Sequence, residues 1–182
     1  MCSFKAMHKI LVAFSLFAAL SSGVFGDCTW PNGTDTTFHW WQDASSVFTT
    51  YSVYTTDTSG NPEYPIHLSL PLIAVLNATV TGSTISQIRE DIALAEWDAT
   101  NCKWNTLPTF GLLNNLDGCT NGLACPIPTG NQIIKMTVDF SKFQAIINLL
   151  KNDAPYQLQF TLTNKQTGDK IVLTSQARAE IK

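Results

Sequence analysis

Hydrophobic and polar residues alternate along much of the chain, and this period of two predicts β-strands with one buried and one exposed face. The alternation is clearest over residues 66–72, 88–97, 133–140, 156–163 and 171–181. Pro71 lies in the first of these segments and cannot donate a backbone hydrogen bond, so we expect an edge strand or a bulge there. The predicted buried faces hold Ile66, Leu68, Leu70 and Leu72; Ile88, Ile92 and Leu94; Ile134, Met136, Val138 and Phe140; Tyr156, Leu158, Phe160 and Leu162; and Ile171, Leu173, Ala177, Ala179 and Ile181.

Residues 141–153 depart from this alternation. Phe143, Ile146, Ile147 and Leu150 recur at spacings of three and four, which is typical of a helix with one apolar face. Ser141 and the glutamine three positions later are spaced for a capping box. We expect one short helix of two or three turns, with its apolar face packed on the core.

One-sided strands separated by turns favour a single all-β domain. The segment "NKQTGDK", residues 164–170, predicts a hairpin turn in which Gly168 is free to take a positive φ. The pattern predicts a β-sandwich of two antiparallel sheets, immunoglobulin-like in broad architecture. The Cys, Trp, Cys spacing of true immunoglobulin domains is missing, so another feature must set the distance between the sheets.

The first 26 residues have the pattern of a secretory signal peptide. Lys5, His8 and Lys9 precede an apolar run of eleven residues, 10–20, which small and weakly polar residues follow. Because a helix needs about 20 apolar residues to cross a bilayer, this run is too short to span one. Val24 and Gly26 suit the small positions before a cleavage site, so the mature domain is predicted to cover residues 27–182.

The charge balance and the sequons fit an exported protein. With the leader removed, nine lysines and arginines stand against fourteen aspartates and glutamates. This acidic balance disfavours nucleic acid as a partner. Asn32 and Asn77 each begin a glycosylation sequon, which predicts surface positions for both asparagines.

The mature chain holds four cysteines, an even number that predicts two disulfides in an oxidising compartment. Cys119 and Cys125 lie six positions apart in "GCTNGLACPIPTG", around a glycine-containing bend, and we interpret them as a local clasp. Cys28 and Cys102 then pair by elimination, although four cysteines permit three connectivities. A zinc site or a catalytic thiol fits less well, because neither a second close cysteine pair nor a Cys/His cluster accompanies the clasp.

The clasp and the residues after it resemble the middle of the ML domain, the secreted lipid-recognition family that includes a Niemann-Pick sterol carrier and a lysosomal ganglioside activator. The residues that carry the resemblance are Cys119, Cys125, Pro126, Ile127 and Gly130. It extends to "NATVTGSTI" and "PTFGLLNNLDGC" before the clasp and to the closing strand, turn and strand, over roughly residues 28–182.

One insertion and one cysteine distinguish this chain within the resemblance. The long segment between Trp97 and Cys119, with its own Cys102, is more similar to the ganglioside activator branch. In the family, a cysteine near the mature N-terminus pairs with one in the last hairpin, but residues 170–182 contain no cysteine. The pairing of Cys28 therefore cannot be carried over from the family.

The resemblance implies that a lipid tail is bound between two incompletely closed sheets, without catalysis or a cofactor, in the extracellular space or the lysosomal lumen. The implied ligand is a sterol, glycolipid or phospholipid, with transient contact to a membrane surface and a lipid hydrolase as a further candidate partner. Each buried CH₂ group of the tail would contribute about 0.8 kcal/mol. The residues expected to line the cavity are Leu70, Leu72, Ile92, Leu94, Met136, Val138, Phe140, Leu158, Phe160 and Leu173.

Two further apolar groups are candidates for contact with lipid. Phe110, Leu112 and Leu113 lie in the Pro- and Gly-containing segment "LPTFGLLNN", where a polar loop is expected. They are predicted to touch a membrane or to rim the cavity, with a buried loop anchor as the alternative. Trp40 and Trp41 must face opposite ways on a strand, so one is expected in the core and the other at the surface.

Two other functions stay open. An enzyme would draw on His39, His67, Asp43 or a serine, but no nucleophile elbow, zinc-binding helix motif or phosphate loop accompanies them. Glu90 and Asp91 are adjacent on a predicted strand and would point to opposite faces. A secreted recognition or adhesion sandwich with a solid core is the stronger alternative, because the same apolar faces can simply pack together.

Overall fold

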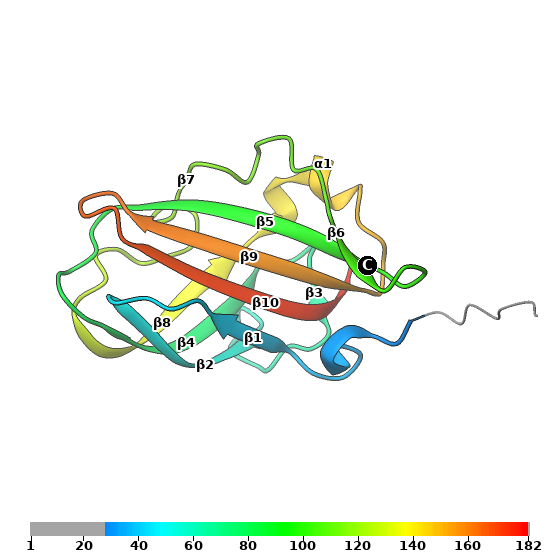
Figure 1. The fold of residues 1–182 in the computed structure, drawn as a ribbon, viewed down its shortest axis with the longest axis horizontal. Helices are drawn as coiled ribbons and strands as arrows, with labels where there is room; N and C mark the ends of the chain where they lie inside the picture. The colour runs from blue at the N-terminus through cyan, green and yellow to red at the C-terminus, as the bar shows by residue number, and fades with distance from the viewer. Residues whose placement is uncertain (1–27, 182) are drawn as a thin grey trace, which may run out of the picture.

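Two β-sheets face each other in the computed structural model, which describes residues 28–181 (Figure 1). The larger sheet has the strand order β1-β10-β9-β5-β6, and the smaller has the order β2-β4-β8. The predicted all-β architecture of two antiparallel sheets is confirmed. The predicted signal peptide, residues 1–26, lies outside the described residues.

The larger sheet is built around three long strands. These are β5 (Ile88–Asp98), β9 (Ala154–Asn164) and β10 (Lys170–Glu180), which pair antiparallel in the order β5-β9-β10. Short strands extend its two sides: β1 (His39–Gln42) and β3 (Ile66–His67) pair with β10, and β6 (Lys103–Thr106) and β7 (Leu116–Asp117) pair with β5. The β3–β10 pair is parallel. The predicted final hairpin is present as β9 and β10.

The smaller sheet consists of β2 (Phe48–Thr56), β4 (Leu72–Val80) and β8 (Gly130–Val138). Its central strand β4 is apolar at every second position, and these side chains face the larger sheet because successive residues of a strand point to opposite faces. The buried inward row of β4 is Leu72, Ala74, Leu76, Ala78 and Val80. The row on β8 is Ile134, Met136 and Val138, as the alternation predicts.

The predicted strand over residues 66–72 is wrong. Its first two residues form β3 in the larger sheet, the chain then turns, and β4 begins in the smaller sheet at Leu72. The turn is closed by the amide of Leu70, which donates to the carbonyl of His67 over 3.1 Å. Pro71, which cannot donate to a ladder, marks the break between the two sheets.

The predicted helix is present but shorter than expected. A 3₁₀ turn, Phe140–Lys142, precedes the α-helix α1, Gln144–Ile147. Asp139 caps this segment by accepting a hydrogen bond from the amide of Ser141. The capping box is not formed as predicted, because the Gln144 side chain donates to the carbonyl of Ser141. A second 3₁₀ turn, Pro31–Gly33, lies near the start of the described chain.

Both predicted disulfides are formed. Cys28 is bonded to Cys102 and Cys119 to Cys125. The first joins residues separated by 74 positions and ties the segment before β1 to the turn between β5 and β6. A crosslink of this loop length stabilises by about 4 kcal/mol in the loop-entropy model. The second closes the loop that leads to β8.

The Gln42 side chain joins the two sheets at the edge formed by β1 and β2. Its amide nitrogen donates to the carbonyl of Phe48 over 2.7 Å, and its amide oxygen accepts from the backbone nitrogen of Thr50 over 2.8 Å. These bonds link the end of β1 to the start of β2, although the two strands belong to different sheets. This contact helps to set the sheet spacing that an immunoglobulin domain sets with its disulfide and tryptophan.

The opposite edge of the smaller sheet is covered by the loop that contains the clasp. The carbonyl of Gly122 accepts from the amide of Thr137 on β8 over 2.9 Å. Gly122 has a φ of +135°, and a Cβ atom at this position would lie 2.0 Å from the carbonyl oxygen of Thr137. This close approach requires glycine, because no side chain fits between the loop and the strand.

We predict that Gly122→Ala destabilises the protein by more than about 3 kcal/mol, because the loop must leave β8 to relieve the clash. Gly82→Ala is the matched control: Gly82 also has a positive φ, +87°, but a Cβ atom there would meet nothing within 4 Å. The control should be destabilised by only about 1 to 2 kcal/mol, because alanine is disfavoured at a positive φ. Chemical denaturation measures both, and equal losses would contradict the role given to Gly122.

Candidate functional site

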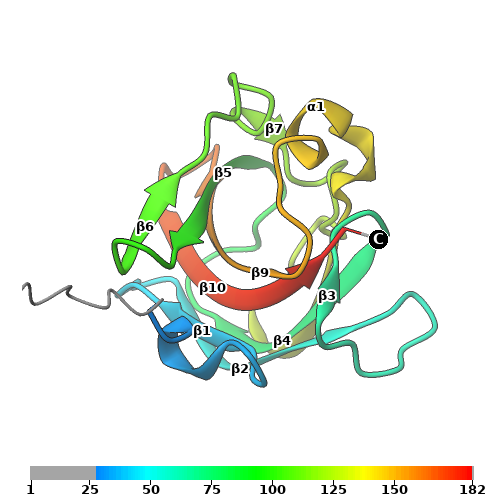
Figure 2. The ribbon, with the colours of Figure 1, turned by 90° about the vertical axis from the view of Figure 1, so that its right-hand side faces the viewer.

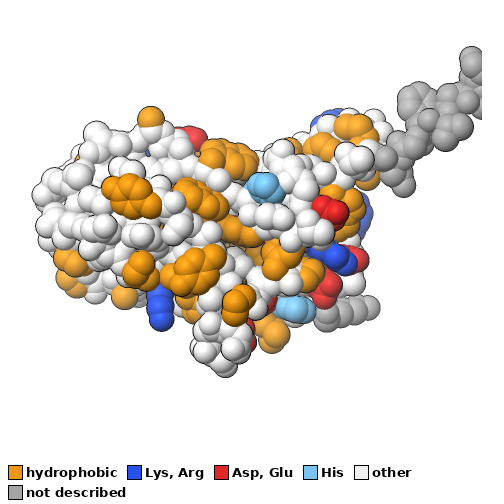
Figure 3. All heavy atoms as spheres, turned by 90° about the horizontal axis from the view of Figure 1, so that it is seen from below, with side chains coloured by type: hydrophobic (Ala, Val, Ile, Leu, Met, Phe, Trp, Pro, Cys, Tyr) orange, Lys and Arg blue, Asp and Glu red, His pale blue; other side chains and the backbone are white. Residues whose placement is uncertain are grey.

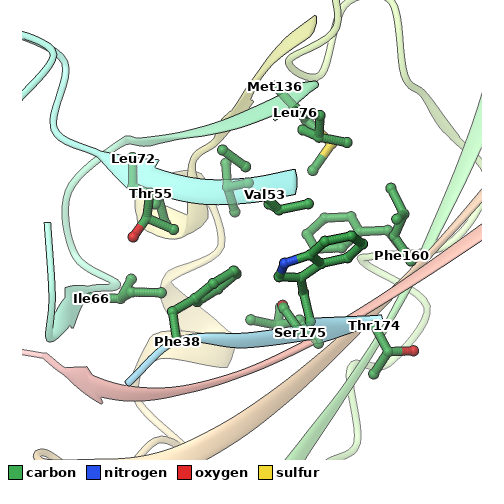
Figure 4. Close-up of a pocket in the computed structure, with 15 residues that line it drawn as sticks. Phe38, Val53, Thr55, Ile66, Leu72, Leu76, Met136, Phe160, Thr174 and Ser175 are labelled. Carbon is green, nitrogen blue, oxygen red and sulfur yellow. The ribbon is translucent and has the colours of Figure 1, made fainter. Parts of the chain in front are cut away.

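An apolar void lies between the two sheets, near the edge formed by β1 and β2 (Figure 4). Leu72, Ala74 and Leu76 of β4 face it from the smaller sheet together with residues of β2 and β8. Strands β9 and β10 form the opposite wall, and Figure 4 shows Phe160 across the void from Leu76 and Met136. The complete lining is Phe38, Trp40, Val53, Thr55, Ile66, Leu72, Ala74, Leu76, Met136, Val138, Leu158, Phe160, Leu173, Thr174 and Ser175.

The void is narrow. It offers about 50 Å³ to the centres of water molecules, and about 510 Å³ when all space between atoms and the open mouth are included. One water needs roughly 10 to 15 Å³ on the first measure. The resting void therefore has room for a few waters or a short piece of hydrocarbon, and a longer guest requires the walls to move.

A surface groove adjoins the void. Its lining includes Phe38, Val53 and Thr55, which also line the void, so the two spaces meet at these side chains. The groove offers about 420 Å³ to water centres and is bounded on its far side by residues 62–64. In Figure 3, hydrophobic side chains gather over the middle of the lower face, whereas charged ones gather towards one side. Because the two spaces share these three side chains, the groove is the candidate mouth of the void.

A second, smaller apolar void lies behind the first. It is bounded by Phe48, Ile85, Leu123 and other core residues nearer the β9–β10 turn. Leu76, Met136 and Leu173 line both spaces. These three side chains form the partition between the two voids.

The structure places most of the predicted cavity residues between the sheets. Those that line the main void are Leu72, Met136, Val138, Leu158, Phe160 and Leu173. Ile92 and Phe140 instead line a small space beside Glu90, together with Val138 and Phe160. Leu94 is a buried core residue and does not line the described voids.

Leu70 does not line the cavity, which corrects the prediction. Its side chain is 59% exposed, because it lies in the turn between β3 and β4 rather than within a strand. The alternation placed it with Ile66 and Leu72, but the turn changes the direction of the side chain. Its exposure is a consequence of the break at Pro71.

The segment 110–113 is divided between surface and core. Phe110 is 74% exposed and Leu112 is 42% exposed, so both remain candidates for membrane contact. Leu113 is fully buried, and its carbonyl accepts from the amide of Ile92, so it anchors the loop and is not a contact residue. The loop connects β6 to β7, on the opposite side of the sheets from β1 and β2 (Figure 2). It therefore does not rim the mouth of the void.

The aromatic residues before and within β1 contribute more to the void than the sequence pattern indicated. Trp40 lines the void, while Trp41 is 40% exposed, so the two face opposite ways as predicted. Phe38 and Val53 also line the void and were not predicted. The sequence offered a signal for Phe38, because it lies two positions before Trp40 and therefore on the same side of the chain.

Glu90 is a buried carboxylate on the inner face of β5. It is 2% exposed and shares this face with Ile88 and Ile92, as its spacing of two from each of them implies. The amide nitrogen of Asn121 donates to its Oε2 atom over 2.6 Å. Burial raises the pKa of Glu90, the hydrogen bond from Asn121 opposes this rise, and the charge of Asp91 adds to it.

Groups associated with other chemistry lie apart from the void. Within residues 28–181, no three side chains of His, Cys, Asp and Glu are arranged to hold a metal ion. His39 and Asp43 lie at opposite ends of the β1 region, and His67 contacts Glu63 and Glu180 at 3.2 and 3.4 Å. No helix in the same range is long and apolar enough to cross a membrane.

The two sequon asparagines occupy different environments. Asn32 is exposed, and its amide nitrogen donates to the amide oxygen of Gln176 over 2.6 Å. Asn77 is half-buried on β4, opposite Ser52 of β2 and Ile133 of β8. Its position between the inward-facing Leu76 and Ala78 directs its side chain to the outer face of the smaller sheet.

Comparisons with known proteins assign no family to the chain. No family model matches it, and no curated protein matches it in sequence. A Niemann-Pick type C2 protein from the Japanese carpenter ant is 12% identical, with a TM-score of 0.45 over 78% of this chain and 99% of that one. The C-terminal domain of wzt is 8% identical, with a TM-score of 0.40 over 80% of this chain and 79% of that one. Likenesses at this level assign no ligand.

We predict that Glu90→Gln stabilises the protein at pH 8, because glutamine removes the buried charge and can still accept from Asn121. Because the folded-state pKa of Glu90 is raised, the buried charge destabilises the wild type at pH values above that pKa. The advantage of the variant should shrink as the pH falls through this pKa, and vanish below the ordinary glutamate value of 4.5.

Thermal unfolding at a series of pH values measures this difference, with Asp43→Asn as a control for the loss of one exposed charge. A difference of 1 kcal/mol corresponds to about 2 to 4 °C in Tm for a protein of this size. A variant that is less stable than the wild type at pH 8 would show that the Glu90 charge is stabilising.

Proposed function

We propose that the protein binds a lipid, holds its apolar tail between the two sheets and carries it without changing it chemically. The observation that supports this proposal is the apolar void between the sheets, which shares Phe38, Val53 and Thr55 with a surface groove. Transfer of hydrocarbon from water into such a space contributes about 0.8 kcal/mol for each CH₂ group. Binding of this kind requires no catalytic residue.

Uptake of a lipid tail requires the void to widen. The void lies at the β1–β2 edge, where the two sheets can move apart. Strands β1 and β2 lie in different sheets and form no ladder with each other. Gln42 joins them at one end, whereas the groove lies towards Phe38 at the other end. Met136 has an unbranched side chain with three rotatable bonds, so it can repack around a guest. Small movements at this edge would lengthen the space available to a tail.

The surroundings of the protein are part of the proposal. Two disulfides fit the oxidising conditions of a secreted protein or of the lysosomal lumen. Transient contact with a membrane would use the exposed Phe110 and Leu112 of the loop between β6 and β7, which lies on the opposite side of the sheets from β1 and β2 (Figure 2). A lipid hydrolase is a further candidate partner.

A secreted recognition sandwich with a solid core is the second candidate function. The observation that favours it is the small resting volume of the main void, about 50 Å³ for water centres. In this case the inward-facing side chains would serve only to stabilise the sandwich, and an outer face would contact the partner. Mass spectrometry of an organic extract of the purified protein separates the two functions, because only a lipid carrier should yield a bound lipid in stoichiometric amount.

We predict that Ala74→Leu destabilises the protein much less than Ala78→Leu does. Both alanines are buried and face inward on β4, but Ala74 lines the void and Ala78 does not. Leucine at 74 should fill the void with little cost, whereas leucine at 78 should overpack the core and cost about 1 to 3 kcal/mol. Ala74→Leu should also reduce binding of the apolar dye N-phenyl-1-naphthylamine by about tenfold or more.

Denaturant unfolding and dye titration on the same preparations provide both readouts. The lipid-binding proposal fails if the wild type binds no dye and Ala74→Leu is destabilised as much as Ala78→Leu. That result would indicate a solid core and favour the recognition sandwich.

A further inference from the structure

The groove beside the void is lined both by apolar side chains and by residues that carry hydroxyl groups. Phe38 and Val53 form part of its floor, where it meets the void. Thr36 and Thr37 are exposed on one side, and Tyr54 is 53% exposed on the other. A lipid whose tail occupies the void would place its head group among these hydroxyls, which can both donate and accept hydrogen bonds.

Glu63 is the one charged side chain among the described residues that line the void and the groove. Its Oε1 atom accepts from the backbone amide of His67 over 2.9 Å, and the His67 ring lies 3.2 Å from the same oxygen. These contacts hold the carboxylate beside His67, and the Glu63 side chain, which belongs to the lining of the groove, is largely buried. An anionic head group in the groove would therefore be repelled by a fixed negative charge.

The other charged groups beside the groove do not offset the negative charge of Glu63. Glu180 lies 3.4 Å from His67 and adds a second carboxylate. Arg178, whose backbone amide donates to the hydroxyl of Tyr64 in the groove lining, binds both carboxylate oxygens of Asp153 with its guanidinium, which also lies 4.0 Å from Glu180. Arg178 is therefore already paired with acidic groups, and an anionic lipid would have to compete with them.

We propose that this groove is a head-group site for an uncharged lipid that carries hydroxyl groups, and that Glu63 excludes lipids with anionic heads. The inference rests on the proposed lipid-binding function and narrows it to one ligand class. Esters of glycerol and other neutral lipids with free hydroxyls belong to this class, whereas ionised fatty acids and lipids with anionic phosphate heads do not.

Displacement of N-phenyl-1-naphthylamine from the purified protein tests this inference. Three competitors share the same twelve-carbon acyl chain and differ in the head group: monolaurin, methyl laurate and laurate. All are used at pH 8, where laurate is ionised, and below the concentrations at which they form micelles. We expect monolaurin to bind at least about tenfold more tightly than laurate, with methyl laurate between them, and tenfold corresponds to 1.4 kcal/mol.

Three variants test whether the difference in affinity between monolaurin and laurate arises in the groove. Glu63→Gln keeps an acceptor for the His67 amide but removes the charge, so laurate should bind several-fold more tightly while monolaurin changes little. Thr37→Lys places a cation on the exposed rim and should also favour laurate. Asp43→Asn removes an exposed charge near the other end of β1 and should leave the ratio of the two affinities unchanged. Thermal melts confirm that each variant is folded.

Each outcome bears on one of the two proposals. If the wild type binds laurate as tightly as monolaurin and Glu63→Gln changes nothing, the head-group inference is overturned while lipid binding stands. If methyl laurate binds as tightly as monolaurin, recognition of hydroxyl groups is wrong and only charge exclusion remains. If the dye and all three lipids fail to bind, the proposed function is overturned and the inference falls with it.

Discussion

The Gln42 side chain forms two hydrogen bonds with the backbone of β2. The arrangement of the two sheets at the β1–β2 edge depends on this contact. Strands in different sheets share no ladder, so their separation must be set by side chains. A primary amide suits this role because it presents one donor and one acceptor to the backbone of the facing strand. The contact lies at one end of the edge, and the void and its groove lie towards the other end.

The two edges of the smaller sheet are closed in different ways, and the position of the mouth follows from the difference. At β8, the backbone of Gly122 contacts Thr137 directly, and a loop held by the Cys119–Cys125 disulfide covers the strand. At β2, closure relies on the Gln42 side chain. Backbone packing without an intervening side chain leaves little freedom to move, whereas a side-chain contact at one end allows the other end to separate. The mouth therefore lies beside β2.

Much of the fold could be predicted from the sequence, because alternation reports directly on which face of a strand is buried. The inward rows of β8 and β9 illustrate this, and the even number of cysteines predicted both disulfides. The break at Pro71 shows the limit, since alternation continued across a turn that moves the chain from one sheet to the other. For the site, the pattern identified Met136 and Phe160 but not Phe38 or Val53, because the void depends on where two edges meet. The inward position of Glu90 could have been predicted, because it is spaced by two from both Ile88 and Ile92. It was missed because a charged side chain is not expected in the core.

The partition formed by Leu76, Met136 and Leu173 would limit the length of a lipid tail bound as proposed. Two of these side chains are branched, whereas Met136 can change rotamer at little cost. A lipid tail bound as proposed would have to displace Met136 to pass from the main void into the smaller space near Phe48 and Ile85. The length of tail that the protein could hold would then depend on the rotamer of this one thioether side chain.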